Sequence, residues 1–154
     1  MSKYTLFVSI IALTALVSCN SNAIFEDNTP IPDRSWTYSF KPSYNVKVDD
    51  KNAKYDVYIN LRHTNDYDYS NIYLLLNEKG KGLKDTSHRK EISLAALDGK
   101  WYGKSAGSLY EVEYLAKKDL IFPDTGLYTF SIEQNMRDNP LKDINDVGIK
   151  VIKK

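Results

Sequence analysis

The sequence has few of the side chains from which metal and redox sites are built. Its 154 residues include one cysteine, Cys19, and two histidines, His63 and His88. One cysteine excludes an intramolecular disulfide and a zinc site made of several thiolates. Neither histidine belongs to a paired-ligand motif, so we expect both on the surface and predict no metal site and no cofactor. The single cysteine needs an explanation of its own.

An excess of charge of one sign is also missing. The chain has 21 basic and 20 acidic residues, and Lys3 is the only charged residue before Cys19. The part that follows Cys19 is therefore neutral overall, and its basic residues are spread along the chain rather than clustered. Such a surface has no field that would gather phosphate backbones, so nucleic acid is not an expected partner.

No hydrophobic run reaches the roughly 20 residues that a membrane-spanning helix needs. The longest, residues 6–17, follows Lys3 and leads into Leu16-Val17-Ser18-Cys19. A positive residue followed by a short apolar run is typical of a signal peptide. The last four residues resemble the bacterial lipobox, in which an aliphatic residue, a tolerant position and a small residue precede the cysteine. We predict a lipoprotein signal peptide over residues 1–18.

The chemistry of lipidation explains these residue types. The Cys19 thiol attacks a lipid to form a thioether, and the small Ser18 lets a membrane peptidase cut before the cysteine. One acyl chain binds a membrane only marginally, whereas two or three on one residue make a permanent anchor. An ordinary cleaved signal peptide, or an uncleaved anchor with an incidental cysteine, is the alternative.

The residues after Cys19 bear on location. Asn20 stands where an aspartate often marks retention in the inner membrane, and no acidic cluster follows directly. We therefore predict an outer-membrane lipoprotein that faces the periplasm. Residues 19–33 are polar and contain Pro30 and Pro32, which predicts a flexible lipidated tether. Residues 34–154 are then one domain.

The domain shows no helical periodicity and no internal repeat. Twelve tyrosines and five phenylalanines favour strands. Alternation of apolar and polar residues predicts strands at 36–40, 44–48, 55–61, 72–76, 91–97, 101–102, 110–114, 128–132 and 147–151. Short strands separated by turn residues predict an all-β fold, an antiparallel β-sandwich.

The segment Asp124-Thr125-Gly126-Leu127-Tyr128 has the D-x-G-x-Y spacing of the tyrosine corner found in Greek-key sandwiches. The cysteine that an immunoglobulin domain carries two residues later is replaced by Phe130. The pattern therefore indicates architecture only. An immunoglobulin-like and a jelly-roll-like strand order both fit it.

Catalytic motifs are missing. Gly103-Lys104-Ser105 imitates the end of a phosphate-binding loop, but Asp98 stands where the first glycine belongs. No nucleophile elbow is present. The pairs Asp66/Asp68 and Glu111/Glu113 could bind calcium or hydrolyse a glycosidic bond, although a solvated strand face is the commoner cause of such spacing.

Aromatic and polar residues leave two binding hypotheses open. Trp36, Trp101 and Tyr102 could form a stacking platform for sugar rings, or they could be half-buried sheet residues. Residues 60–71 are unusually polar for a link between two hydrophobic strands. Such a loop suits recognition, and the same composition also builds a turn that satisfies its own polar groups.

Taken together, the mature chain resembles the GldH family of gliding-motility lipoproteins from Bacteroidota. The resemblance rests on the lipobox and on residues 59–62, 65–71, 98–101, 122–128, 132–137 and 146–149. It covers nearly all of the chain after the predicted tether. Residues 77–87 depart from the family pattern, being short and rich in lysine and glycine.

The resemblance implies a non-enzymatic structural or assembly component of the gliding machinery and of the type IX secretion apparatus linked to it. Its partners would be companion lipoproteins and envelope proteins. Alternatives from other classes are a glycan-binding lipoprotein and a carboxylate-based hydrolase. We expect a surface for a protein partner around Arg62, Asn65, Tyr67, Trp101, Gln134, Met136 and Arg137.

Overall fold

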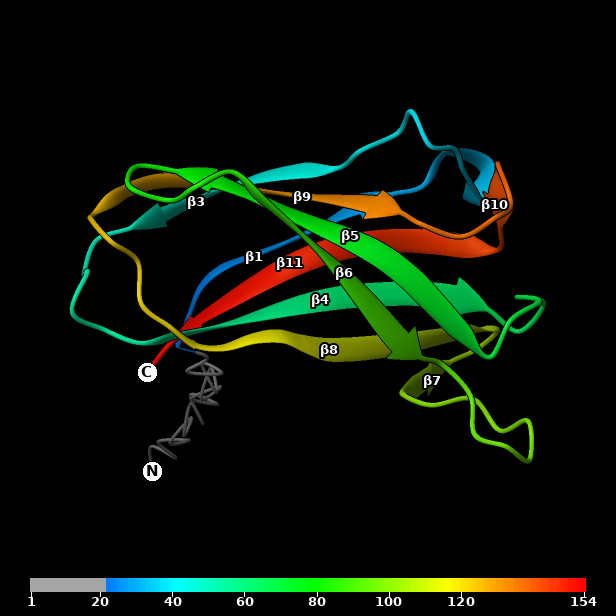
Figure 1. Cartoon of the computed structure of the whole chain (residues 1–154). Helices are drawn as coiled ribbons and strands as arrows, with labels where there is room; N and C mark the ends of the chain where they lie inside the picture. Colours follow the sequence, from blue (N-terminus) through cyan, green and yellow to red (C-terminus); the bar gives the residue numbers. More distant parts are fainter. Residues whose placement is uncertain (1–21) are drawn as a thin grey trace, which may run out of the picture.

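Two antiparallel sheets packed face to face make up residues 22–154, the part of the chain that the computed structural model describes (Figure 1). This confirms the predicted all-β sandwich. The predicted signal peptide, residues 1–18, and the lipidation site Cys19 lie outside the described residues. Within residues 22–154, no helix has the length and hydrophobicity to cross a membrane.

The sheets contain five and four strands, and a small two-stranded ladder closes one end. The five-stranded sheet has the order β1 (Ala23–Pro30), β11 (Ile144–Lys153), β4 (Tyr55–Thr64), β8 (Leu109–Leu120) and β7 (Lys104–Ala106). The four-stranded sheet has the order β3 (Ser43–Val48), β9 (Gly126–Gln134), β5 (Asn71–Gly80) and β6 (Thr86–Ser93). The ladder pairs β2 (Ser35–Trp36) with β10 (Leu141–Lys142), after a 3-10 turn at Pro32–Arg34.

The strand order resolves the choice between the two predicted sandwiches. The chain passes back and forth between the sheets, so that β1, β4, β8 and β11 belong to one and β3, β5, β6 and β9 to the other. The first and last long strands, β1 and β11, are neighbours. This is the eight-stranded double Greek key of a jelly roll, with β7 added at one edge.

Alternating side chains fill the space between the sheets. On β4, Val57, Ile59 and Leu61 are fully buried, because residues two apart on a strand face the same side. The other sheet contributes the equally buried side chains of Leu74, Leu76 and Phe130. Each such side chain contributes roughly 1.5–3 kcal/mol by leaving water, so these alternating positions determine which face of each strand turns inward.

The tyrosine corner is present as predicted. The Tyr128 hydroxyl donates to the carbonyl of Asp124 at 2.7 Å and accepts the Asp124 N–H at 3.2 Å, and it also lies 3.1 Å from the carbonyl of Lys81. The ring is fully buried. Gly80 makes room for it, since a Cβ there would stand 2.1 Å from Tyr128 Cδ1. The corner thus joins the β8–β9 connection to the end of β5.

The flexible tether predicted over residues 19–33 is wrong for residues 23–33. Residues 23–30 form β1, which pairs with β11 from Ala23 opposite Ile152 to Pro30 opposite Asp146. Polar residues misled the prediction because β1 is an edge strand with most of its side chains in water. Pro30 is tolerated because it ends that edge strand.

Three other strand predictions need correction. The expected strand at 36–40 ends at Trp36, because Phe40 N–H donates to Thr37 O and closes a turn. The strand expected at 91–97 runs over Thr86–Ser93 instead. At 101–102 only one isolated bridge forms, between Trp101 and Ala95. Lys104 and Ser105 belong to the short strand β7, and strand β8 follows it, so the strand-to-helix setting of a phosphate-binding loop does not form here.

Candidate functional site

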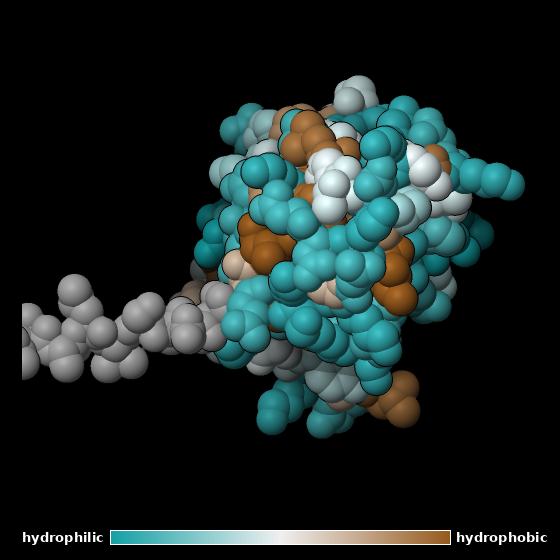
Figure 2. All heavy atoms as spheres, turned by 90° about the vertical axis from the view of Figure 1, so that its left-hand side faces the viewer, coloured by the Kyte–Doolittle hydropathy of each residue, from teal (hydrophilic) through white to brown (hydrophobic). Residues whose placement is uncertain are grey.

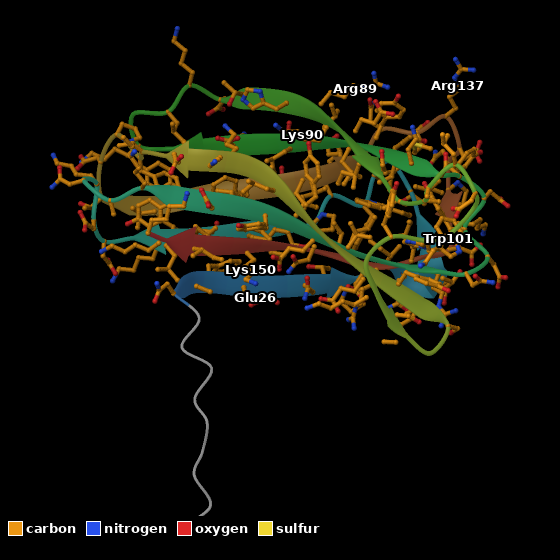
Figure 3. The ribbon with its side chains drawn as sticks, turned by 90° about the horizontal axis from the view of Figure 1, so that it is seen from below. Glu26, Arg89, Lys90, Trp101, Arg137 and Lys150 are labelled. Atoms are coloured by element: carbon orange, nitrogen blue, oxygen red, sulfur yellow. The ribbon has the colours of Figure 1, made fainter. Side chains whose placement is uncertain are left out.

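Three connections meet at one end of the sandwich, the end away from the start of β1 (Figure 1). They are residues 65–70 between β4 and β5, residues 94–103 between β6 and β7, and residues 135–140 between β9 and β10. We call this the loop end. Figure 3 shows Trp101 and Arg137 there, on two different connections. Six of the seven residues expected at a partner surface lie on or beside these connections.

A groove of about 580 Å³ opens at the loop end. We call it the arginine groove, and its lining residues are Tyr69, Tyr73, Arg89, Asn135, Met136, Arg137 and Asp138. Two of these, Met136 and Arg137, were predicted from the sequence. A neighbouring hollow of about 430 Å³, between Tyr67, Leu97 and Trp101, shares Tyr69 with the groove.

Gln134 holds one wall of the arginine groove in place. The side chain is only 3% exposed. Its Oε1 accepts the N–H of Met136 at 2.9 Å, and its Nε2 donates to the carbonyl of Asp138 at 2.9 Å. A single buried amide thus satisfies backbone groups on both sides of the turn. Gln134 shapes the surface from below and is not itself open to a partner.

Further contacts fix the same wall from outside. Tyr38 donates its hydroxyl to the carbonyl of Met136 at 2.8 Å. The N–H of Asn135 donates to the carbonyl of Tyr73 at 2.8 Å, and the Tyr73 N–H lies 3.2 Å from the Met136 sulfur. The Tyr69 hydroxyl donates to the Asp138 carboxylate and joins this wall to residues 65–70. The groove is therefore preorganised before any partner arrives.

Arg89 and Arg137 give the groove its positive charge. The Arg89 guanidinium lies over the Tyr73 ring, 3.9 Å from its centroid, and its Nε donates to Asn135 Oδ1 at 3.0 Å. Both contacts hold the side chain without occupying its terminal nitrogens. Arg137 is exposed. Neither arginine makes an ion pair among residues 22–154.

An aromatic cluster around a buried histidine lies beneath residues 65–70. His63 is fully buried, so the expectation that it lies on the surface is wrong. Its ring centroid is 4.6 Å from that of Trp101, 5.6 Å from that of Tyr67 and 5.7 Å from that of Tyr110. The alternation Val57, Ile59, Leu61 continues to this position, and that was the signal in the sequence. His88 is exposed, as expected.

Burial makes His63 a poor proton acceptor. Loss of water lowers the pKa of His63, and a hydrogen bond between Nδ1 and the carbonyl of Thr64, at 2.9 Å, opposes this only in part. Since a carbonyl accepts only, Nδ1 carries the proton and Nε2 has a lone pair. That Nε2 has no hydrogen-bond partner among the described residues. His63 is therefore neutral, and it packs as an aromatic ring.

Trp101, Asn65 and Tyr67 are joined to this cluster. Trp101 Nε1 donates to Asn65 Oδ1 at 3.1 Å, and Asn65 is exposed. Tyr67 is 4% exposed and donates its hydroxyl to the carbonyl of Asn71 at 3.1 Å. Burial raises the pKa of the Tyr67 phenol. Tyr67 is therefore a structural residue of the loop, while Asn65 and one face of Trp101 remain accessible.

Arg62 lies apart from the other six predicted residues, on the outer face of the five-stranded sheet. Its Nε lies 2.9 and 2.7 Å from the two carboxylate oxygens of Asp146, and its Nη2 lies 2.7 Å from Oδ2. The Asp146 side chain is only 3% exposed. Such a fork-like pair on neighbouring strands β4 and β11 fixes their register.

The three residues expected to form a sugar-stacking platform do not share one exposed surface: Trp36 is buried, whereas Tyr102 is 47% exposed. Trp36 is fully buried and donates its Nε1–H to the carbonyl of Phe40. Trp101 meets His63 edge-on, and the guanidinium of Arg89 covers one face of Tyr73. The one stacked pair among residues 22–154 joins His63 to Tyr110, and His63 is out of reach of a ligand.

The two carboxylate pairs differ: Glu111 and Glu113 lie on a solvated strand face, as the commoner explanation expects, whereas Asp66 and Asp68 lie in a connection between strands. Glu111 and Glu113 point outward from β8, and Glu113 pairs with Lys150 at 2.9 Å. Figure 3 shows Lys150 on the outer face of this sheet, near Glu26. Asp66 and Asp68 are exposed in the turn before β5. Among residues 22–154, no three His, Cys, Asp or Glu side chains are grouped so that they could hold a metal ion.

Sequence reasoning missed Tyr69, Tyr73, Arg89 and Asp138 as parts of one surface. Tyr69 stood in the polar segment that suggested recognition. Arg89 carried no signal, because it reaches the groove only when β6 pairs with β5, with Arg89 opposite Leu75. A groove built from the connection at 65–70, strands β5 and β6, and the connection at 135–140 is visible only once the jelly roll has formed.

Comparisons of the sequence with known proteins identify a family. The family model described as GldH lipoprotein matches residues 23–151. The Gliding motility lipoprotein GldH homolog of Christiangramia forsetii is 29% identical, over 99% of this chain and 97% of the relative. The Gliding motility lipoprotein GldH of Flavobacterium johnsoniae is 24% identical, over 96% and 95%. No solved structure matches. The chain belongs to the GldH lipoprotein family.

Proposed function

We propose that this lipoprotein is held on the outer membrane by lipid on Cys19, facing the periplasm, as a non-enzymatic assembly component of gliding motility and the associated type IX secretion machinery. The names of both relatives support a lipoprotein with a role in gliding motility, and the lipobox supports lipid on Cys19. A lipid anchor raises the effective concentration of a domain near membrane partners. The protein would therefore act by keeping its partners close together at the membrane, without catalysing a reaction.

The observation that carries the assembly role is the preorganised arginine groove. Tyrosine, methionine and arginine are the residue types enriched at protein interfaces and their hot spots. Here they gather in a groove whose walls are fixed by Gln134, Tyr38 and the bond between Tyr69 and Asp138. A rigid surface loses little conformational entropy on binding. It therefore suits a stable protein contact.

The charge of the groove defines the partner further. Within residues 22–154, the guanidinium groups of Arg89 and Arg137 make no ion pair, whereas the Asp138 carboxylate is already engaged by Tyr69. A segment of an envelope protein that presents aspartate or glutamate beside an apolar residue would fit both arginines and Met136. A glycan is a poorer fit for this end, because Trp36 is fully buried and Trp101 packs edge-on against His63.

Site-specific crosslinking in intact cells tests the proposal. A photo-crosslinking residue at position 137 should capture one or a few envelope proteins, and Arg89→Ala should reduce that yield at least several-fold. The matched control is the same residue at position 115, because Leu115 is exposed on β8 and far from the groove. Equal capture from both positions, or no effect of Arg89→Ala on a folded protein, would refute the groove as the partner site.

A further inference from the structure

The start of β1 is pinned at one corner of the sandwich. The N–H of Lys153 donates to the carbonyl of Asn22 at 3.0 Å, and Ala23 pairs with Ile152. Cys19 precedes Asn22 by three residues. At most about 3.6 Å per residue, this stretch spans no more than about 11 Å. If Cys19 carries lipid, as the proposed function requires, the corner at Asn22 cannot move farther than that from the membrane surface.

Three connections between strands lie at the same end of the sandwich as this corner. The strand register places Val48 opposite Gly126, Tyr55 opposite Leu120 and Gly80 opposite Tyr128. The connections that adjoin these pairs therefore lie at the same end as Asn22. They are residues 49–54, 81–85 and 121–125. We call it the anchor end. Figure 2 looks onto it and shows a largely hydrophilic surface interrupted by separate hydrophobic patches.

The exposed apolar residues differ between the two ends. At the anchor end they are aliphatic: Ile24 is 39%, Ile121 56% and Leu127 60% exposed. At the loop end they are mainly tyrosines, namely Tyr38, Tyr69 and Tyr102, together with Leu97. Aliphatic side chains that stand out singly around a lipid attachment point are suited to the boundary between headgroups and acyl chains.

Free lysines accompany these aliphatic residues. Lys51, Lys54 and Lys84 are exposed and make no ion pair within residues 22–154. The aspartates of the same end are largely engaged, since Asp50 pairs with Lys153 and Asp124 with Lys81. A basic residue near an anionic lipid surface contributes about 1 kcal/mol. The unpaired charge of this end therefore suits anionic headgroups.

We infer that the anchor end rests on the headgroups of the leaflet that holds the lipid, and that the sandwich stands upright with the loop end away from the membrane. β4 and β11, of ten residues each, connect the two ends. At about 3.3 Å per residue they place the arginine groove roughly 33 Å above the headgroups. The occupant of the anchor end is a phospholipid surface that carries anionic lipid.

A fluorophore on an introduced cysteine measures this orientation. The label attaches only to the introduced thiol, because Cys19, the one natural cysteine, already carries the lipid. The lipidated protein is placed in vesicles of phosphatidylethanolamine and phosphatidylglycerol that contain a headgroup spin-labelled quencher. A probe at Ile121→Cys should be quenched at least several-fold more than a probe at Leu97→Cys, which is fully exposed at the loop end. Equal quenching, or stronger quenching at position 97, would overturn the upright orientation.

Two controls separate this inference from the proposed function. Flotation of the protein with the vesicles reports the lipid anchor, so loss of flotation would overturn both proposals, whereas flotation with equal quenching would overturn the orientation alone. Replacing Lys51, Lys54 and Lys84 together by glutamate should lower quenching at position 121 without loss of flotation. Unchanged quenching in that variant would show that the three lysines do not hold the anchor end at the membrane. The proposal that this end rests on anionic lipid would then be wrong.

Discussion

His63 occupies a core position at which a hydrophobic residue would be the ordinary choice. Its neighbours in the aromatic cluster, Tyr67, Trp101 and Tyr110, offer Nε2 no hydrogen bond, and loss of water lowers the pKa of His63 below its usual 6.5. The unfolded chain therefore binds a proton at a pH at which the folded chain does not. The sign of the linkage is that stability falls as the pH falls through 6.5.

The resulting prediction concerns the slope of stability against pH. Below pH 6.5 the free energy of unfolding should decrease by up to about 1.4 kcal/mol per pH unit until the folded state also takes up the proton. His63→Phe, which keeps a ring in the cluster, should flatten this slope. Urea unfolding between pH 5 and 7 measures it. His88→Gln, at an exposed position outside the aromatic cluster, is the matched control.

The pair between Arg62 and Asp146 gives a second prediction at a single position. In Arg62→Met the buried Asp146 carboxylate keeps only the amide of Asn145, whose Nδ2 is 2.6 Å away, as a donor within the described residues. Breaking a fully buried pair costs about 3–5 kcal/mol, and partial exposure of Arg62 reduces this to roughly 2–3 kcal/mol. Chemical denaturation measures the loss.

A double variant tests whether the cost comes from the orphaned carboxylate. Arg62→Met with Asp146→Val removes the unpaired charge and should be more stable than Arg62→Met alone. A double variant that is as unstable as the sum of both single changes would mean that the pair is not what Arg62 contributes. The position would then matter through packing of its methylene groups.

At the scale of elements, the connection from β8 to β9 depends on Tyr128. Tyr128→Phe keeps the ring but removes the donor to the Asp124 carbonyl and the acceptor of the Asp124 N–H. The free energy of unfolding should fall by about 1–3 kcal/mol, the cost of polar groups left unsatisfied. Tyr58→Phe on β4 is the control, because the Tyr58 hydroxyl makes no side-chain hydrogen bond among residues 22–154; a comparable loss there would contradict the assignment.

The elements also show what the sequence could predict. Strands with one face in the core, such as β4 and β9, follow from period-two alternation, and the corner at Tyr128 follows from local spacing. Edge strands do not, because the polar residues of β1 and β7 face water on both sides and resemble a linker. Only Met136 and Arg137 of the arginine groove could be predicted, because Arg89 comes to lie beside them only through the pairing of β6, β5 and β9.

The whole molecule has two ends of different chemistry, joined by strands that run its full length (Figure 1). In the proposed arrangement, the lipid and the unpaired lysines lie at one end, and the arginine groove lies at the other. If both ends work together, the height of the groove above the membrane is a functional quantity. The chain between Cys19 and β1 sets this height because it is too short to let the domain tumble.

Lengthening that chain should therefore impair partner capture while leaving the anchor and the fold intact. Twelve glycine and serine residues inserted after Ser21 would add a flexible segment of about 19 Å root-mean-square length. The domain could then leave the headgroups, so that the effective concentration of the groove at a partner of fixed height would fall. Crosslinking from position 137 should drop several-fold, with flotation and thermal unfolding unchanged. An insertion of one residue is the matched control, and undiminished crosslinking in the long variant would mean that proximity alone, without a fixed height, is enough.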